Sequence, residues 1–259
     1  MLTFGSNVLL DGPAGVGKSS YLIALSQKLG SSFTSFSCAA SNDAGMDLIG
    51  TSSRWANGKP GKLHETLVTQ GCPNPIILLD EIEKAIASKT NNIVGTLFGL
   101  LEKNNAKIFR DEFIDVPMDA SMINWFATSN DASVLTDPIR DRFVVLQVRA
   151  PNHNELRQMI PNIYRDMVVE KKLEQVCAPN LSQAVIRRIA GFEGVSIRLV
   201  KRMIEDALGN MLERVSLTKS RSNSQKLRGR RLSVRLIDLP DWRKFQDQQS
   251  QRKRMGFIW

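Results

Sequence analysis

Apolar and polar positions follow two periods along the first 150 residues, and each period predicts one kind of element. Unbroken or alternating apolar runs of strand length cover residues 8–10, 32–38, 76–79, 122–128 and 143–148. Apolar residues recur at helical spacing over 21–29, 62–69 and 92–103. The continuous run at 76–79 is typical of a strand covered on both faces. Strands that alternate with helices predict a parallel α/β sheet, with binding at the carboxyl ends of its strands.

The pattern changes near Ala150-Pro151. Beyond this point helical spacing dominates, and the helices expected there cover residues 155–172, 181–189 and 196–215. Alternating residues predict a short strand at 231–237, and two strand-like runs at 106–110 and 112–116 lie in the first half. Residues 39–61, rich in Ser, Asn, Gly and Asp, predict a long loop with short helical pieces. We therefore predict two domains, an α/β domain at 1–150 and a small helical domain with a basic tail at 151–259.

Composition is that of an ordinary soluble globular protein, with 42% hydrophobic and 24% charged residues. No apolar run approaches the ~20 residues that cross a bilayer, and the N-terminus has no secretory pattern. Three cysteines without a C-x-x-C pair are expected to be reduced, and two histidines argue against a zinc site. We therefore expect a cytoplasmic location and no membrane partner.

The net charge of +9 is concentrated at the C-terminal end. Residues 216–259 hold twelve Lys or Arg and three Asp or Glu, so the rest holds 23 of each sign. Such a tail can bind nucleic acid or an acidic partner surface. A solvated or mobile segment is the commoner explanation for a charged run, and we favour it.

A phosphate-binding motif begins directly after the first predicted strand. It consists of Gly12, Pro13, Ala14, Gly15, Val16, Gly17, Lys18 and Ser19. Glycines let backbone N–H groups turn toward phosphate oxygens, and the N-terminus of the following helix adds partial positive charge. Lys18 can reach β- and γ-phosphates, and the Ser19 hydroxyl can ligate Mg²⁺. The alternative, a glycine turn before an ordinary helix, is disfavoured because motif and context agree.

Two polar strand ends supply groups for ATP hydrolysis. Asp80 and Glu81 follow the buried run, and we assign Asp80 to the metal and Glu81 to the attacking water. Asn130 ends the next apolar run and can lie between water and γ-phosphate if the two strands are neighbours. The alternatives are a pair of solvated acids and an Asn that merely closes a strand.

Arg140 and Arg142 precede the last strand of the first half. Either guanidinium can reach the γ-phosphate of a neighbouring subunit, as arginine fingers do. The alternative is a surface ion-pair cluster with Asp137 and Asp141.

Arg198 lies in the first turn of a predicted helix, with Ser196 as its N-cap. A cation is unfavourable at this end of a helix, and a bound phosphate would compensate. The alternative is an exposed arginine paired with an acid such as Glu193.

These motifs in this order resemble the AAA+ ATPases, and in detail the ATPase module of the Lon protease family. In that family residues 12–19 are the Walker A loop, 76–81 with the following Ile82-Glu83-Lys84 the Walker B run, and 127–130 the first sensor. The resemblance places Arg142 at the finger position, with Arg140 as the alternative, and Arg198 in the second sensor. It covers most of residues 7–215 and implies a P-loop NTPase sheet with helices on both faces, a helical lid, and ATP with Mg²⁺ between them.

The same resemblance places Trp55 and Ala56 on an axial pore loop that grips unfolded polypeptide. Trp55 matches the aromatic position, whereas Ala56 is smaller than the usual aliphatic partner. A flat side chain on a loop flanked by Gly and Asn suits sequence-tolerant gripping. The alternative is that Trp55 packs into the core.

The resemblance implies a homo-oligomeric ring, expected to be a hexamer, that remodels or unfolds a protein or serves a separately encoded partner protein. The family's upstream adenine-contacting segment, N-domain and Ser-Lys peptidase have no counterpart in this sequence. The resemblance therefore implies neither the family's nucleotide affinity nor its base choice, and we expect no protease activity. Two alternatives remain: a nucleic-acid motor or loader that uses the basic tail, and a nucleotide-dependent scaffold of a larger complex.

Overall fold

The computed structural model describes residues 5–39, 44–87, 93–192, 194–221 and 231–240. The chain divides into two compact units, Met1–Ala150 and Pro151–Trp259. Each unit has a hydrophobic core of its own. Within the described residues, no helix combines the length and apolar character needed to cross a bilayer.

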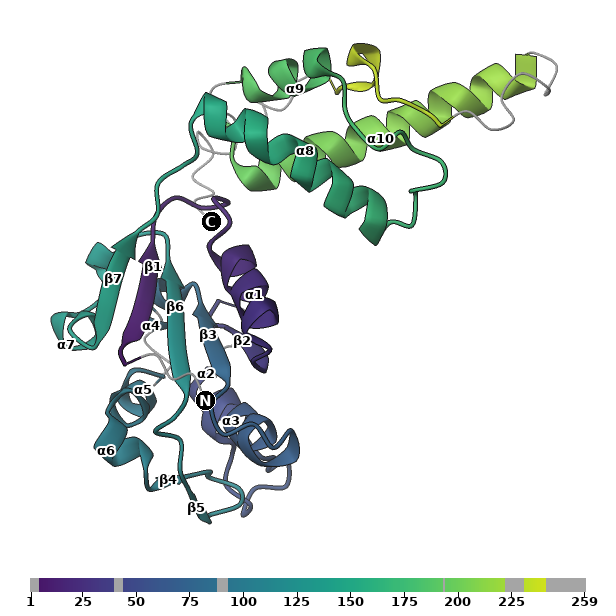
Figure 1. Ribbon diagram of the computed structural model, residues 1–259. Helices are drawn as coiled ribbons and strands as arrows, with labels where there is room; N and C mark the ends of the chain where they lie inside the picture. The colour runs from purple at the N-terminus through teal and green to yellow at the C-terminus, as the bar shows by residue number, and fades with distance from the viewer. Residues whose placement is uncertain (1–4, 40–43, 88–92, 193, 222–230, 241–259) are drawn as a thin grey trace. The chain divides into compact units, whose positions relative to one another are not determined.

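The first unit is built on a parallel five-stranded sheet (Figure 1). Its strands are β1 (Asn7–Asp11), β2 (Phe33–Ser37), β3 (Ile76–Asp80), β6 (Asn124–Ser129) and β7 (Phe143–Gln147). They lie in the order β2-β3-β6-β1-β7, so β6 separates β3 from β1. The register pairs Leu79 with Ala127 and Leu10 with Thr128. This order brings the carboxyl ends of β1, β3 and β6 together at one edge.

Successive side chains of each strand point to opposite faces of the sheet and pack into two hydrophobic cores, one on each face. Leu10 and Leu78 pack with Leu22 of α1 (Lys18–Leu29) on one face. Leu9 and Leu79 pack with α4 (Ile82–Ala87) and α5 (Ile93–Leu101) on the other. Figure 1 shows α1 on the opposite face from α4 and α5. The predicted α/β class, with helices on both faces, is confirmed.

Short elements connect these layers. They are α2 (Ala44–Ile49), α3 (Lys62–His64), the π-helical turn η1 (Glu65–Thr69), α6 (Lys103–Ala106), β4 (Phe109–Arg110), β5 (Pro117–Met118), the 3-10 turn η2 (Ala132–Val134) and α7 (Asp137–Arg140). The strands predicted at 106–110 and 112–116 were wrong in extent. The carboxylate of Asp111 accepts N–H bonds from Phe113 (2.9 Å) and Ile114 (3.2 Å), and these bonds fold the second run into a turn.

The second unit consists of α8 (His153–Glu170), α9 (Gln183–Ala190), α10 (Ile197–Arg221) and the 3-10 turn η3 (Leu236–Asp238). Asn152 and Glu155 form a capping box at the start of α8. The predicted strand at 231–237 was wrong, because Leu232 makes one isolated bridge to Cys177 and the chain then coils into η3.

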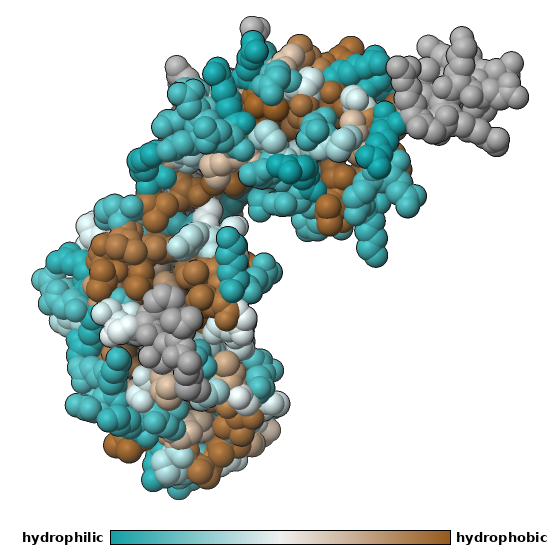
Figure 2. All heavy atoms as spheres, viewed as in Figure 1, coloured by the Kyte–Doolittle hydropathy of each residue, from teal (hydrophilic) through white to brown (hydrophobic). Residues whose placement is uncertain are grey.

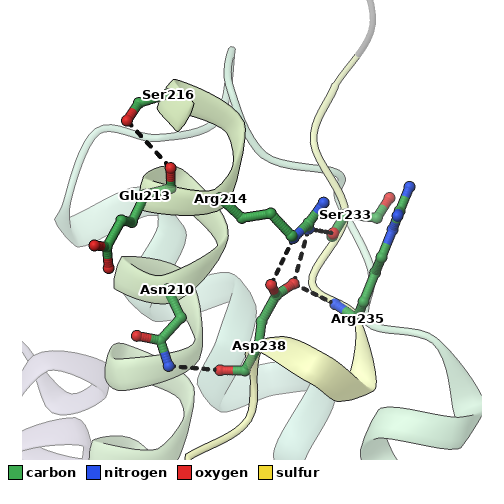
Figure 3. Close-up of polar contacts among 7 residues, drawn as sticks. All are labelled: Asn210, Glu213, Arg214, Ser216, Ser233, Arg235 and Asp238. Atoms are coloured by element: carbon green, nitrogen blue, oxygen red, sulfur yellow. Dashed lines mark hydrogen bonds and ion pairs between the residues drawn. The ribbon is translucent and has the colours of Figure 1, made fainter. Parts of the chain in front are cut away.

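An arginine–aspartate pair holds the 231–240 segment against α10 (Figure 3). Asp238, 2% exposed, accepts bonds from Arg214 Nε (2.7 Å) and Nη2 (2.8 Å) and from the N–H of Arg235 (2.8 Å). Asn210 Nδ2 donates to the Asp238 carbonyl at 2.9 Å. Burial raises the pKa of Asp238, but the bonds from Arg214 and Arg235 outweigh it and hold that pKa below its usual value. These contacts explain why the segment bends rather than extends.

Replacing Arg214 with alanine is expected to destabilise the second unit by about 3 kcal/mol, because Asp238 then stays buried without its partner. The pair stabilises above the unfolded-state pKa of Asp, about 4, and its contribution is lost as pH falls through the lowered folded pKa. The deficit should therefore shrink in acid. Urea unfolding measures it, with Lys171→Ala as control, since the exposed pair with Glu205 contributes less than about 1 kcal/mol. Equal deficits in the two variants would contradict the assignment.

Candidate nucleotide-binding site

The loop at residues 12–17 passes from β1 to α1 through close backbone contacts. A Cβ on Gly12 would lie 2.0 Å from the carbonyl oxygen of Val148, so only glycine fits there. Gly17 precedes α1 with a φ of 97°, a conformation that favours glycine. No side chain caps α1, so the first N–H groups of the helix are available to an anion.

Lys18 lies inside this loop and is 8% exposed. Its Nζ donates to the carbonyls of Gly12 (2.6 Å) and Pro13 (3.0 Å) and to Asn130 Oδ1 (3.2 Å). Burial lowers the pKa of Lys18, and the carboxylate of Glu83 is the strongest of the nearby charges that oppose this shift. The ammonium group is thus held at the strand edge by acceptors that a phosphate can replace.

Ser19, Asp80 and Thr128 form a second cluster at the same edge. Asp80 Oδ1 accepts from Ser19 Oγ at 2.8 Å and from Thr128 Oγ1 at 2.5 Å. Thr128 Oγ1 also accepts the N–H of Glu81 at 3.0 Å. A hydroxyl and a carboxylate oxygen side by side fit Mg²⁺, which prefers oxygen ligands and completes its shell with phosphate and water. Sequence reasoning gave Thr128 no role of its own.

Glu81 stands in the left-handed region, with a φ of 57°. A non-glycine residue in this region is uncommon and such strain is concentrated at functional sites. β3 ends at Asp80, and the left-handed turn at Glu81 directs the next side chain away from the path of the strand.

Asn130 directly follows β6 and joins the site through both ends of its amide. Oδ1 accepts from Lys18, while Nδ2 donates to Glu83 Oε1 at 2.9 Å. The direct pairing of β3 with β6 meets the condition on which Asn130 was expected to lie between the attacking water and the γ-phosphate. Sequence reasoning missed Glu83 as a contact residue; its place in the acidic run after β3 was the available signal.

The arginines before β7 make contacts within their own unit. Arg142 forms an ion pair with Glu102, donates to the Pro138 carbonyl at 2.6 Å and stacks over Phe98, 4.5 Å from the ring centroid. Arg140 pairs with Asp137 at 2.5 Å. The expected alternative of ion pairs therefore holds in part for Arg140, whereas Arg142 uses Glu102 instead of Asp141.

The other predicted residues lie elsewhere. Trp55 is 61% exposed, so the alternative in which it packs into the core is wrong, and Ala56 is exposed beside it. Arg198 is an exposed residue of the second unit, where Ser196 Oγ caps α10 by accepting the N–H of Leu199 at 3.2 Å. Glu193 and most of the basic tail, at 222–230 and 241–259, lie outside the described residues.

Comparison with known proteins identifies the class of the chain. Residues 8–149 match the AAA family, the "ATPase family associated with various cellular activities". The chain therefore belongs to the AAA family, and it carries the nucleotide-binding domain that its fold and phosphate loop indicate.

Its curated relatives include Lon proteases. The chain is 35% identical over 145 residues to a mitochondrial Lon protease homolog of Yarrowia lipolytica, covering 56% of this chain and 12% of that protein. It is 31% identical over 144 residues to a Lon protease of Fusobacterium nucleatum, covering 56% and 19%. It is 26% identical over 215 residues to the peroxisomal Lon protease homolog 2 of Caenorhabditis elegans, covering 82% and 27%. The matched region is thus 12 to 27% of these relatives' length, and the predicted resemblance to the Lon ATPase module is confirmed.

Proposed function

We propose that this chain is an ATP-hydrolysing motor of Lon type that remodels a protein substrate. The observation that supports it most is that Lys18, Ser19, Asp80 and Asn130 lie together at the carboxyl ends of the strands, in two hydrogen-bonded clusters. Binding, metal ligation and water positioning each need one of these groups. Membership of the AAA family supports the same chemistry.

The chain's residues divide the hydrolysis among them. Lys18 and the N–H groups of the phosphate loop hold the triphosphate, and Ser19 and Asp80 would hold Mg²⁺, which neutralises charge on the phosphate oxygens when bound. Glu81 takes a proton from the attacking water as its oxygen bonds to the γ-phosphorus, and ADP leaves. Asn130 fixes the position of that water.

Self-association into a ring is proposed from the edge of the sheet. β7 pairs only with β1 among the described strands, and Val144 and Leu146 on it are each 48% exposed. Figure 2 shows hydrophobic residues gathered where Figure 1 places β7. An edge strand with apolar side chains favours contact with another surface. Arg142 immediately precedes this strand, so a neighbouring subunit there would be within its reach.

Hydrogen bonds close the loop that carries Trp55 and anchor its base. The N–H of Thr51 donates to the Lys59 carbonyl at 3.0 Å, the N–H of Lys59 donates to Thr51 Oγ1 at 3.0 Å, and these two bonds close the loop. Asp111, 0% exposed, accepts the N–H of Gly61 at 2.7 Å and so ties the base of the loop to the β4–β5 hairpin. A large exposed aromatic ring on a closed, anchored loop suits contact with a polypeptide.

Replacing Trp55 with alanine is expected to abolish stimulation of ATP hydrolysis by an unfolded protein. Loss of an exposed tryptophan anchor weakens such contacts by at least about 10-fold. The measurement is the ratio of ATPase rates with and without a carboxymethylated, permanently unfolded protein, and Val68→Ala is the control because Val68 is also exposed and apolar. A full ratio in the Trp55 variant would overturn polypeptide gripping by this loop. Stimulation by single-stranded nucleic acid instead, falling steeply with salt, would support the motor that uses the basic tail.

A further inference from the structure

Glu83 is a buried acid at the nucleotide site to which the steps above give no task. It lies in the first turn of α4 and is 6% exposed. Its Oε1 accepts two bonds from Asn130, from Nδ2 at 2.9 Å and from the backbone N–H at 3.3 Å. Its Oε2 has no hydrogen-bond partner within the described part of the chain.

A buried carboxylate with one unpaired oxygen is costly, and packing alone gives no reason for it. An acid in the first turn favours a helix, but an exposed acid does so equally well. The buried position instead brings the Glu83 carboxylate close to two groups of the nucleotide site. One is Asn130, and the other is Lys18. Burial lowers the pKa of Lys18, and Glu83 opposes that shift more than any other charge does.

We propose that Glu83 is the positioning residue of Asn130 for ATP hydrolysis. An ionised carboxylate only accepts hydrogen bonds, so the group facing Glu83 must be the Asn130 NH₂. The amide cannot then rotate by half a turn, and Oδ1 is fixed toward Lys18 and the phosphate loop. From there Oδ1 accepts a hydrogen bond from the ammonium group or from the attacking water. The inference rests on ATP hydrolysis at this site and is independent of protein remodelling.

Replacing Glu83 with glutamine keeps a side chain of the same length but no longer fixes which end of the Asn130 amide faces it. Its amide both donates and accepts, so it permits Asn130 to turn its NH₂ toward the ammonium group of Lys18. Two donors, the Asn130 NH₂ and the Lys18 ammonium group, would then face each other. The attacking water would lose Asn130 Oδ1 as its acceptor. We expect kcat of Glu83→Gln to fall about 10- to 100-fold, as when a partner that orients a functional ligand is removed.

A double-mutant cycle on kcat tests the route of this effect. Glu83→Gln, Asn130→Ala, the combined variant and the control Glu65→Gln, an exposed acid of η1, are compared at saturating ATP. If Glu83 acts through Asn130, the combined variant is as slow as Asn130→Ala and no slower. Affinity for an ATP analogue and the unfolding temperature without nucleotide are measured on the same samples. Glu83→Gln should unfold at the wild-type temperature or above it, because it loses a buried charge.

Three results would overturn the inference. The first is a Glu83→Gln variant that, per nucleotide-bound protomer, turns over ATP as fast as the control. The second is multiplication of the two single effects in the combined variant, which would mean that Glu83 acts by another route. The third is a lowered unfolding temperature with the loss of kcat matched by the unfolded fraction. Wild-type protein that hydrolyses no ATP would instead refute the ATPase itself, and the Trp55 result has no bearing on this cycle.

Discussion

Replacing Lys18 with alanine is expected to weaken binding of a non-hydrolysable ATP analogue by at least about 100-fold. Charge-assisted hydrogen bonds to phosphate contribute about 1.5–3 kcal/mol each, and two of them reach this factor. The structure adds a second cause. Glu83, Asp11, Asp80 and Glu81 all act on the Lys18 ammonium. Without it, their negative charge would act on the triphosphate uncompensated.

A lysine of the same helix provides the control. Lys28 lies exposed in the last turn of α1, so Lys28→Ala changes the net charge equally and leaves the phosphate loop untouched. Titration calorimetry compares the affinities, and circular dichroism shows whether both variants keep their helices. Wild-type affinity in a folded Lys18→Ala protein would remove the nucleotide site from this loop.

The parts of the site that depend on local sequence were predictable, because each is a run of neighbouring residues. The phosphate loop needs only a strand, a glycine turn and a helix in succession, and the structure has all three. Asn130 was predicted to lie between the attacking water and the γ-phosphate only on the assumption that its strand is the neighbour of the strand that ends at Asp80. The pairing of β3 with β6 meets that assumption.

The contacts that the sequence did not reveal depend on backbone turns or on distant partners. Glu83 contacts Asn130, 47 positions away, after the chain turns at Glu81, and a glutamate in the left-handed region has no sequence signal. Arg142 meets Glu102, 40 positions away in sequence. The prediction of a strand at 231–237 was wrong for the same reason, because the ion pair between Arg214 and Asp238 outweighs the alternation of apolar residues there.

If Arg142 is the arginine finger, as we propose, it must give up contacts within its own subunit to reach a neighbour. Arg142 holds a partly exposed ion pair with Glu102, and such pairs contribute up to about 1 kcal/mol. A planar guanidinium binds phosphate oxygens in pairs and more strongly, so exchange at a subunit boundary is favourable. Arg140, whose side chain is 41% exposed beside Asp137, is the comparison residue.

Arg142→Ala is therefore expected to retain ATP binding and to lose hydrolysis by about 1,000-fold or more, the usual effect of removing an arginine finger. Its unfolding temperature must be measured as well, because Glu102 and Phe98 lose a partner. Loss of hydrolysis in Arg140→Ala with retention in Arg142→Ala would assign the finger to Arg140. Unchanged hydrolysis in both variants would contradict a finger at this position.

Mixing two inactive variants decides whether the arginine acts on a neighbouring subunit. Glu81→Gln should bind ATP without cutting it, since the amide cannot take the proton of water. In a ring with head-to-tail contacts, an Arg142→Ala subunit still supplies Glu81, and a Glu81→Gln neighbour still supplies Arg142. An equal mixture then contains about a quarter of complete sites, and turnover should return although neither component has any. Absence of turnover in mixed rings of confirmed composition would place both groups on one subunit. Brisk hydrolysis by a strictly monomeric wild-type protein would show the same thing without mixing, because a monomer has no neighbour to supply an arginine.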